Sequence, residues 1–384
     1  MDQALLALGV ATLAFALAVA AELWWGHRSV ARLHRVPPLP DDELPALSVI
    51  VPARDEERNL EQALRSVLAQ AGPRVEVIAV DDRSTDATGA ILERMAAAEP
   101  RLRVVHVREL PPGWLGKTHA LDLGAGHAAG ELLLFTDADV VMAPDTLRRA
   151  AAYFVRERLD HLTLGPRLEL PGWLLQLFCT VFGVMFALFA RPWKARDPRS
   201  SSHVGIGAFN LLRAEVYRAI GTHRAIALRP DDDMKLGKLV KKHGFRSAFA
   251  DAAELLSVEW YRTLGELVRG LRKNGFAGVD YRLSLVVLGT VGQLTMFFWP
   301  FVAVFVTAGA TRLAYLGAVA VYLALYAGLA RQQRTPAWLG VFWPVATLLF
   351  LFVVWNATLY ALVRRRIEWR GTHYPLDELR ANRV

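Results

Sequence analysis

The stretch VEVIAVDDRSTDATGAILERM, residues 75–95, contains the pattern that decides the fold. Its first six residues are mostly apolar and β-branched, which is typical of a strand buried in a sheet, and the strand ends in two acids, Asp81 and Asp82. The following residues, TDATGAILERMAAAEP, predict a helix with Thr85 or Asp86 at its N-cap. A strand that ends in acid and leads into a helix is half of a βαβ unit.

The same alternation continues on both sides of this stretch. LSVIVPA predicts a strand and NLEQALRSVLAQA the helix after it, while LRVVHVRE, KTHALDLGAGHAAG and ELLLFTDADVVM predict strand, helix and strand. Strands that alternate with helices indicate an α/β fold with a doubly wound, mostly parallel sheet. Ligands of such sheets bind outside the carboxyl ends of the strands. The acids at 81–82 and at 137–139 therefore mark the expected ligand-binding edge.

The chain has 384 residues, of which 53% are hydrophobic, and the apolar excess lies at its two ends. Residues 4–25 contain a single charge, Glu22, and at ~1.5 Å per residue they are long enough to cross a bilayer core of ~30 Å. We expect an uncleaved anchor over residues 1–27, because MDQ is acidic and no small-residue cleavage site follows. Three more candidate spans lie at about 284–308, 313–330 and 337–363.

Four parts follow from this distribution. After the anchor and a Pro-rich linker, VPPLPDDELPA, residues 45–280 have the charge density of a soluble domain. Residues 281–365 are predicted to form a transmembrane bundle of about three helices, and 366–384 a basic tail. Within the domain, the apolar residues 172–193 are predicted to form a helix lying in the membrane interface, since a span there would divide the domain between two sides.

Charge predicts the sidedness and the partners. Basic residues directly follow the anchor, so the central domain is expected to be cytoplasmic in an integral protein of the cytoplasmic membrane. The net charge of +8 comes with arginines clustered at membrane edges, which indicates contact with an anionic lipid bilayer and no nucleic acid partner. Three tail spans would leave RRRIEWRGTHY outside, against the positive-inside rule. Either one tail segment is re-entrant at 343–344, or 284–330 does not cross twice. The lone Cys179 excludes an intrachain disulfide.

Two acidic motifs at strand ends are candidates for ligand binding. In Asp137-Ala-Asp139 the carboxylates alternate, so both would point to one side of an extended segment and suit a divalent cation, Mg²⁺ or Mn²⁺, together with substrate phosphates. A capped turn is the competing interpretation. Asp81 and Asp82 could accept hydrogen bonds from a nucleoside, and a helix N-cap is equally typical of such residues.

A third acidic motif is RPDDDMKLGKLV, residues 229–240, which precedes an amphipathic helix. Negative charge is favourable at a helix N-terminus, but one carboxylate satisfies a cap, and here there are three, Asp231, Asp232 and Asp233. A carboxylate held near a second acidic site could act as the general base for a hydroxyl group.

Taken together, these stretches resemble family 2 glycosyltransferases with the GT-A fold. The resemblance covers about residues 46–280 and rests on LSVIVPARDEERNL, VIAVDDRSTDAT, GKTHALDLG, LLLFTDADV, GIGAFNLLRAEVYRAIGTH and DDDMKLGKLVKKHGFR, in that order. It implies that Asp137 and Asp139 hold the metal, with Asp137 also at the sugar-nucleotide diphosphate, and that Asp82, with Asp81 as a further candidate, binds the base. It implies an acidic pair Asp232–Asp233 with Asp233 as the catalytic base, so replacement of Asp231 is expected to be mild.

The resemblance further implies a nucleotide-sugar site. Its candidate residues are Pro52, Ala53, Arg54, Glu56, Asp81, Asp82, Lys117, Asp137, Arg269 and Arg272. The family often has (Q/R)xxRW after the base helix, whereas VRGLRKNGF places Lys273 where the Trp would stand. That departure indicates an acceptor other than a growing glycan.

The membrane layout resembles ceramide, hopanoid-associated and carotenoid glycosyltransferases. We therefore expect an inverting enzyme that makes one transfer from a nucleotide-sugar, UDP-glucose or similar, to a membrane lipid hydroxyl. Three alternatives are a processive polysaccharide synthase, a polyprenyl-phosphate glycosyltransferase, and a non-catalytic scaffold or transporter. The scaffold is disfavoured because all the expected acids are present and charges inside the candidate spans are nearly absent.

Overall fold

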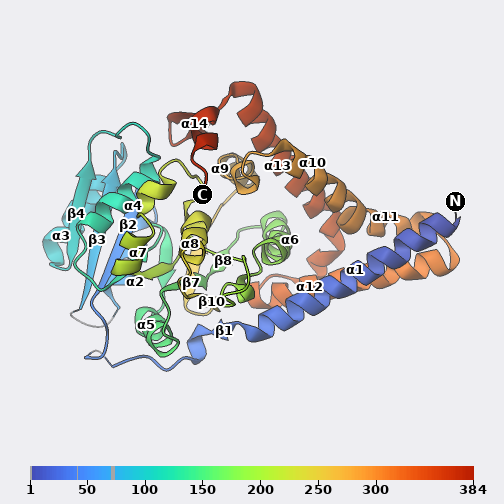
Figure 1. Ribbon diagram of the computed structural model, residues 1–384, viewed down its shortest axis with the longest axis horizontal. Coiled ribbons are helices and arrows are strands. Elements are labelled where there is room, and N and C mark those ends of the chain that lie inside the picture. Colours follow the sequence, from blue (N-terminus) through green and yellow to red (C-terminus); the bar gives the residue numbers. More distant parts are fainter. Residues whose placement is uncertain (1, 41, 71–73) are drawn as a thin grey trace. The chain divides into compact units, whose positions relative to one another are not determined.

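The computed structural model describes residues 2–40, 42–70 and 74–384 (Figure 1). They divide into two compact units. Of the described residues, the first comprises those within 2–29, 170–190 and 260–380, and the second those within 30–169, 191–259 and 381–384.

The second unit is built on an eight-stranded sheet in the order β1-β10-β7-β9-β5-β2-β3-β4. All neighbours are parallel except β9, which runs antiparallel to β5 and β7. The mostly parallel sheet is as predicted. Its strands are β1 Ala31–Arg32, β2 Leu47–Ala53, β3 Val75–Asp82, β4 Leu102–Val107, β5 Leu132–Phe135, β7 His161–Gly165, β9 Asn210–Arg213 and β10 Ser247–Asp251. A smaller sheet contains β6 Val140–Met142, β11 Leu256–Glu259 and β8 Arg167–Glu169.

Helices cover both faces of the large sheet, because its central strands are apolar on both sides. One face packs against α2 Leu60–Leu68, α3 Thr88–Ala98 and α5 Thr146–Arg156, and the other against α4 Gly116–Gly126, α7 Ala214–Ala219 and α8 Asp232–Lys242. Alternate residues of one strand show this division: Val49 and Val51 of β2 belong to the first core and Ile50 to the second. Three short 3₁₀ turns complete the unit: η1 Leu33–Arg35, η2 Pro192–Lys194 and η3 His223–Ile226.

The start of α3 differs from the prediction. The helix begins at Thr88 with Ala87 as its N-cap, not Thr85 or Asp86. The Asp86 carboxylate accepts hydrogen bonds from the N–H groups of Thr88 (2.9 Å) and Glu57 (3.1 Å). The N–H of Thr85 donates to Asp55 at 2.7 Å. These polar residues join the loop after β3 to the loop after β2, and the helix starts only after them.

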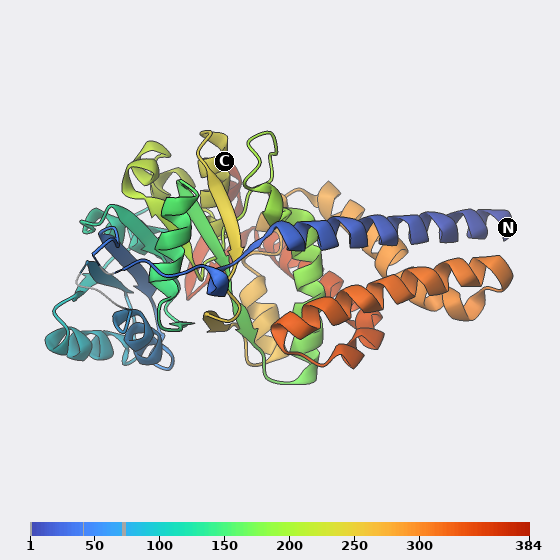
Figure 2. The same ribbon diagram turned by 90° about the horizontal axis from the view of Figure 1, so that it is seen from below.

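The first unit contains the long apolar helices. Its elements are α1 Asp2–Ser29, α6 Trp173–Ala190, α9 Leu264–Leu271, η4 Ala277–Val279, α10 Leu283–Gly292, the π-helical turn η5 Gln293–Phe298, α11 Trp299–Val306, α12 Gly309–Gln333, η6 Ala337–Phe342, α13 Trp343–Arg364, the hairpin β12 Arg366–Trp369 and β13 Thr372–Pro375, and α14 Leu376–Ala381. Helices α1 and α12 lie side by side along their length (Figures 1 and 2). Gly9 and Gly317 allow this approach, since a Cβ on either would lie 3.3 Å or less from a side chain of the other helix.

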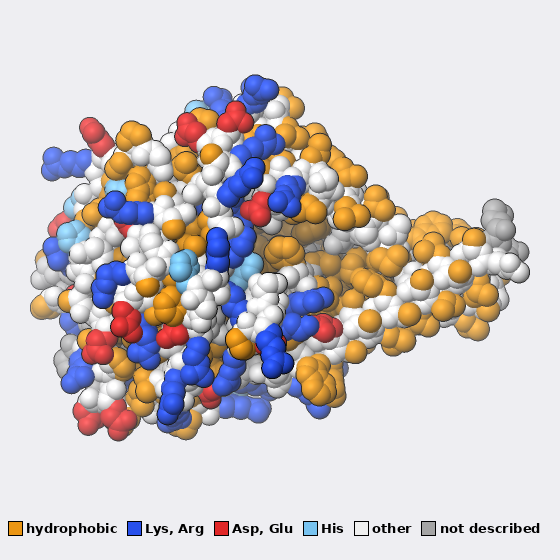
Figure 3. All heavy atoms as spheres, in the orientation of Figure 1, with side chains coloured by type: hydrophobic (Ala, Val, Ile, Leu, Met, Phe, Trp, Pro, Cys, Tyr) orange, Lys and Arg blue, Asp and Glu red, His pale blue; other side chains and the backbone are white. Residues whose placement is uncertain are grey.

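Five helical segments of the described chain are long and apolar enough to cross a membrane: 3–29, 173–194, 283–306, 309–333 and 337–364. Four of them coincide with the predicted anchor and tail spans. Large apolar side chains are exposed on them, including Leu17, Phe305 and Leu313. Figure 3 shows hydrophobic side chains, in orange, gathered over the long helices. Surfaces of this kind are expected to face lipid.

The bounds of the second unit differ from those of the predicted domain, 45–280. The unit comprises residues 30–169, 191–259 and 381–384, so it excludes residues 170–190 and 260–280. Helix α6 packs with the other apolar helices in a cluster that includes Leu177, Val181, Tyr322 and Trp343. Residues 260–280 lie with them, because α9 and the turn after it pack on α13: a Cβ on Gly275 would be 2.8 Å from the Ala357 side chain.

Candidate active site

The two acids of the DxD motif lie at the end of β5, as predicted, but the segment is not extended. Residues 138–139 form a turn between β5 and β6. The Asp137 N–H donates to the Gly207 carbonyl at 3.1 Å, and its carboxylate lies 2.7 Å from the Lys117 ammonium group. The motif is therefore tied to the loop before β9 and to the first turn of α4.

Lys117 connects two of the acidic motifs. Its Nζ lies 2.7 Å from Asp137 Oδ1 and 3.7 Å from Asp232 Oδ2. Burial alone would lower the pKa of Lys117, but Asp137, Asp232 and Asp233 together raise it above its usual value. The ammonium group thus stays charged between the DxD turn and the start of α8.

The three aspartates at 231–233 have different surroundings. Asp231 is the N-cap of α8 and forms two 2.9 Å hydrogen bonds with the guanidinium group of Arg229, whose side chain is 2% exposed. Lys235 lies 3.5 Å from the same carboxylate. Asp231 is therefore part of a buried ion pair. This pair argues against the expectation that replacement of Asp231 is mild, because removal of one buried partner leaves the other charge uncompensated.

Asp232 and Asp233 point instead toward the DxD turn. Asp232 approaches Lys117, and one oxygen of Asp233 accepts the Gly207 N–H at 2.9 Å. Burial raises the pKa of Asp233 above its usual value. The charge of Lys117 and the backbone N–H groups of Met234 and Gly207, which donate to Asp233, favour the charged form. The carboxylate is held by the backbone and has an increased affinity for a proton.

Gly207 lies between the DxD turn and the acidic pair. Its N–H donates to Asp233 and its carbonyl accepts from Asp137. A Cβ at this position would lie 2.4 Å from Asp137 Oδ2 and 3.2 Å from Lys117 Nζ. Gly205 and Gly237 allow the same loop to lie on α8, since a Cβ on either would come within 2.1 Å of a backbone oxygen. Of the two glycines of GIGAF, Gly205 is therefore required by close backbone approach, and Gly207 by the approach of the Asp137 and Lys117 side chains.

Asp139 is crowded by negative charge. Burial, together with Asp137 and Glu56, raises its pKa to about 7. A divalent cation would relieve this repulsion, and Asp137 and Asp139 supply the carboxylate oxygens that Mg²⁺ and Mn²⁺ prefer. No cluster of three or more His, Cys, Asp or Glu residues that could hold a metal is found among the described residues. Divalent cations of this kind are usually held by one or two carboxylates together with phosphate oxygens, and Asp137 and Asp139 fit that pattern.

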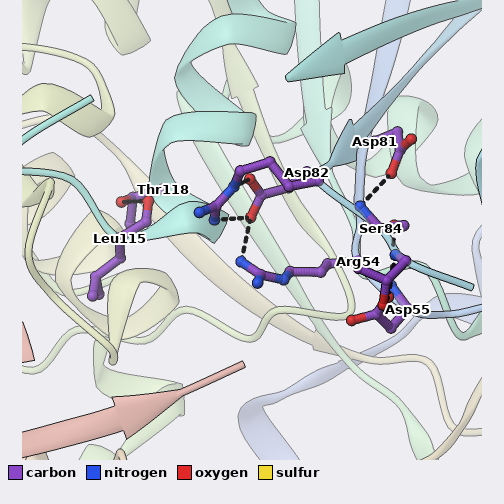
Figure 4. A network of polar contacts seen from close by, with 9 residues as sticks. Arg54, Asp55, Asp81, Asp82, Ser84, Leu115 and Thr118 are labelled. Carbon is purple, nitrogen blue, oxygen red and sulfur yellow. Dashed lines mark hydrogen bonds and ion pairs between the residues drawn. The ribbon is translucent and has the colours of Figure 1, made fainter. Parts of the chain in front are cut away.

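The ends of β2 and β3 form a second polar cluster (Figure 4). Asp82 accepts hydrogen bonds from Arg83 at 2.8 and 3.0 Å, and Arg54 points toward it at 3.7 Å. Asp81, which pairs with Ala53 across the strands, turns the other way: it accepts the Ser84 N–H at 3.2 Å and lies 2.9 Å from His106 Nδ1.

The first turn of α4 lies against this cluster. A Cβ on Gly116 would be 2.1 Å from Asp82 Oδ2, so the helix that carries Lys117 starts directly beside Asp82. Pro52 lies on β2 in register with Val80, and the Glu56 N–H donates to Thr88 Oγ1 at 2.8 Å. The second unit thus contains every predicted site residue except two.

Those two are Arg269 and Arg272, which belong to the first unit. Arg272 donates to Asn356 at 3.2 Å and stacks over the ring of Tyr360 at 4.5 Å. Lys273, at the position of the missing Trp, lies 3.8 Å from the centre of the Trp369 ring. These contacts connect α9 and the residues after it to α13 and to the β12–β13 hairpin.

His223 is a residue of the site that the sequence did not single out. His223 lines a small pocket with Lys117, Asp232 and Asp233, and it is 1% exposed. Its Nδ1 is 2.7 Å from the hydroxyl group of Tyr217, and burial, with Lys117 nearby, lowers its pKa to about 3. The imidazole is therefore neutral. His223 ends the stretch RAIGTH, which belongs to one of the motifs that carry the family resemblance. Nothing in the local sequence pattern distinguished a histidine of the site from a histidine that is only buried in the core.

A mostly parallel sheet with acidic side chains at the ends of β3 and β5, facing a helix that begins with further acids, defines the glycosyltransferase class with the GT-A fold. Residues 48–221 match the family model described as Glycosyl transferase family 2. The chain thus carries, over a little less than half of its length, a domain similar to family 2 glycosyltransferases, as the sequence predicted.

Curated relatives and solved structures agree with this assignment. The 4,4'-diaponeurosporenoate glycosyltransferase of Staphylococcus haemolyticus (strain JCSC1435) is 25% identical over 260 residues, which are 66% of this chain and 68% of that protein. The enzyme of the same name from Staphylococcus aureus (strain USA300) is 30% identical over 185 residues, 47% of each protein, so the match spans about half its length. A mannosyltransferase from Pyrobaculum calidifontis, solved with GDP-Man and Mn²⁺, shares the fold: it aligns over 93% of this chain and 99% of its own, with a TM-score of 0.56 and 20% identity.

Proposed function

We propose that this protein transfers one sugar from a nucleotide-sugar, UDP-glucose or a close analogue, to a hydroxyl group of a membrane lipid, with inversion at the sugar carbon. The observation that carries the proposal is the meeting of Lys117, the DxD turn and the acidic pair of α8 around Gly207. This arrangement places groups that suit a diphosphate beside a group that suits proton removal.

The donor is proposed to lie along the ends of β2, β3 and β5. Arg54 and Asp82 would contact the nucleoside, and Lys117 would neutralise the departing diphosphate. Asp137 and Asp139 would hold a divalent cation, Mg²⁺ or Mn²⁺, which when bound supplies further positive charge to the phosphates. The Mn²⁺ of the Pyrobaculum enzyme supports a cation without identifying it.

Asp233 is proposed as the general base. A hydroxyl group is a poor nucleophile at neutral pH, and an inverting transfer needs a base on the face opposite the diphosphate. The raised pKa of Asp233 improves its ability to accept a proton, and the Gly207 N–H fixes its direction. Asp232, which approaches Lys117, would orient the ammonium group of that lysine.

The names of the relatives favour a second acceptor class. They describe glycosyltransferases of 4,4'-diaponeurosporenoate, and the ending of that name denotes a carboxylate. A carboxylate acceptor is already ionised, as a polyprenyl phosphate is, and needs no strong base. The two classes therefore differ in how much they depend on Asp233.

The connectivity constrains the membrane topology that we propose. Residues on both sides of α6, up to Glu169 and from Arg191, belong to one unit, and we therefore propose that α6 lies in the membrane interface. Residues 381–384 belong to the same unit, and we therefore propose that the chain between 260 and 380 crosses the membrane an even number of times. In this topology not all three apolar segments of the tail span, and RRRIEWRGTHY lies on the side that the positive-inside rule favours.

The experiment that tests the function compares Asp233→Asn with Asp232→Asn in the purified full-length protein. Nucleotide release from UDP-sugars and the mass of the lipid product would be measured with hydroxyl and carboxylate lipids. With a hydroxyl acceptor, Asp233→Asn should lower turnover by about 10²–10⁴-fold, the usual contribution of a general base, while UDP affinity stays unchanged. A loss only in Asp232→Asn would assign the base to Asp232. Full activity of both variants would rule out the hydroxyl mechanism and favour an ionised acceptor.

A further inference from the structure

The last four residues of the sequence, 381–384, lie with the sheet unit and not with the helices that precede them. The side chain of Asn382 forms two hydrogen bonds with the backbone of one loop: its Oδ1 accepts the Leu228 N–H at 3.1 Å, and its Nδ2 donates to the Ala225 carbonyl at 3.2 Å. The carbonyl of Val384 accepts from Lys238 Nζ at 2.7 Å. The tail is therefore held by specific polar contacts.

The loop that Asn382 contacts, residues 225–228, is connected to α4. The carbonyl of Ala227 accepts two hydrogen bonds from this helix, one from the Leu115 N–H at 2.9 Å and one from Thr118 Oγ1 at 2.6 Å. Leu115 is the N-cap of α4, and Lys117 lies between the two donors. The carbonyl of Ala227 thus holds the first turn of α4, in which Lys117 lies.

The same loop leads into the acidic helix. Arg229, whose N–H donates to the Ile226 carbonyl at 3.0 Å, forms the buried pair with Asp231 at the start of α8. Asp232 and Asp233 follow directly. One short loop therefore sets both the ammonium group and the acidic pair of the candidate active site.

We infer that Asn382 is a positioning residue of the glycosyl transfer, acting through the 225–228 loop on Lys117 and on the start of α8. This inference rests on the proposed function for its activity readout. The side-chain amide of Asn382 both accepts a hydrogen bond from the Leu228 N–H and donates one to the Ala225 carbonyl. An alanine at this position would remove both hydrogen bonds. A displacement of catalytic groups by about 1 Å can cost about 10²-fold in rate, so a loop released by a remote residue has a measurable effect.

The test compares Asn382→Ala with Arg383→Ala, an exposed neighbour, in the full-length protein. Asn382→Ala should lower turnover at least tenfold, while the affinity for UDP, which depends on the ends of β2 and β3, changes less than threefold. Hydrogen exchange should quicken at 225–228 and at 115–118 but not in β2, and the melting temperature should stay within about 2 °C. Arg383→Ala should behave as wild type. A uniform rise in exchange with a lower melting temperature would show a purely structural role and overturn the inference.

A double-mutant cycle with Thr118→Val separates the proposed route from an independent effect. If Asn382 acts through Ala227, the double variant should lose no more turnover than the more damaging single variant, because both changes release the same contact. Multiplied losses would overturn the inference, as would turnover of Asn382→Ala within twofold of wild type. A wild-type protein that transfers no sugar would instead refute the proposed function, and the exchange at 115–118 would still decide whether Asn382 holds α4.

Discussion

Gly207→Ala tests whether the DxD turn and Lys117 must be placed as the structure shows. The new Cβ would lie 2.4 Å from Asp137 Oδ2, whereas ordinary contact begins at about 3.4 Å, so the carboxylate has to retreat by about 1 Å. It would also press on Lys117 Nζ, 3.2 Å away. Both atoms are ends of side chains, so the backbone is not forced to move.

A displacement of this size at the reacting groups is expected to lower turnover by about 10²-fold. We also expect weaker Mn²⁺ binding, because Asp137 is a proposed ligand. The melting temperature should change by less than about 2 °C. Nucleotide release with a lipid acceptor, Mn²⁺ titration and thermal unfolding measure the three quantities.

Two other glycines serve as controls for this substitution. Gly126→Ala, at the end of α4, places a Cβ with no atom within 4 Å and should behave as wild type. Gly205→Ala places its Cβ 1.8 Å from the backbone oxygen of Asp233, so it should destabilise the fold itself. Turnover of Gly207→Ala within threefold of wild type, with unchanged Mn²⁺ affinity, would refute the assignment of this turn to the reaction.

Three further outcomes are expected. Asp231→Asn should lower the free energy of unfolding by about 3 kcal/mol, because it leaves the buried Arg229 without its carboxylate. Urea titration measures this quantity. A change under about 0.5 kcal/mol, which is typical of a surface substitution, would contradict the buried-pair argument. A hydrogen bond to Glu93 raises the pKa of His106, burial opposes this shift, and Asp81 adds to it. The stabilisation of the fold by His106 is therefore present below the unfolded pKa of about 6.5, and it is lost as the pH rises through the higher folded pKa. His106→Gln should then lower the melting temperature by about 2 °C at pH 6 and not at pH 9, since an exposed pair contributes less than about 1 kcal/mol; an equal effect at both pH values would exclude this linkage. Cysteines placed at Arg383 and at Arg156 should react with an impermeant maleimide from the same side of the membrane, and labelling from opposite sides would disprove the even number of crossings.

Much of the architecture follows from patterns that are local in the chain. Apolar runs of strand length alternate with helical periodicity between residues 47 and 142, and that alternation predicts the parallel sheet because each element buries its own apolar face. The acids at 81–82 and 137–139 follow such runs directly, so their place at the strand ends could be predicted. The lengths of the apolar segments at both ends likewise predicted four of the five candidate spans.

The pairing of charges was decided only in three dimensions. Asp231, Asp232 and Asp233 are adjacent and chemically identical in the sequence, yet Asp231 is buried against Arg229 while Asp232 approaches Lys117, 115 residues earlier in the chain. Such a contact depends on how α4 and α8 pack on one face of the sheet, and no local pattern encodes it.

The same holds for the residues that the sequence did not single out. Sequence alone determined which segments become strands, helices and candidate membrane spans, because hydrophobic periodicity acts over a few residues. The tertiary structure alone decided that Gly207 lies between two acidic motifs, that His223 reaches the pocket and that Asn382 holds the loop before α8. It also assigned residues 170–190 and 260–280 to the helical unit. Each of these depends on close packing between segments far apart in the chain, where the available space and the facing partner determine what a side chain does.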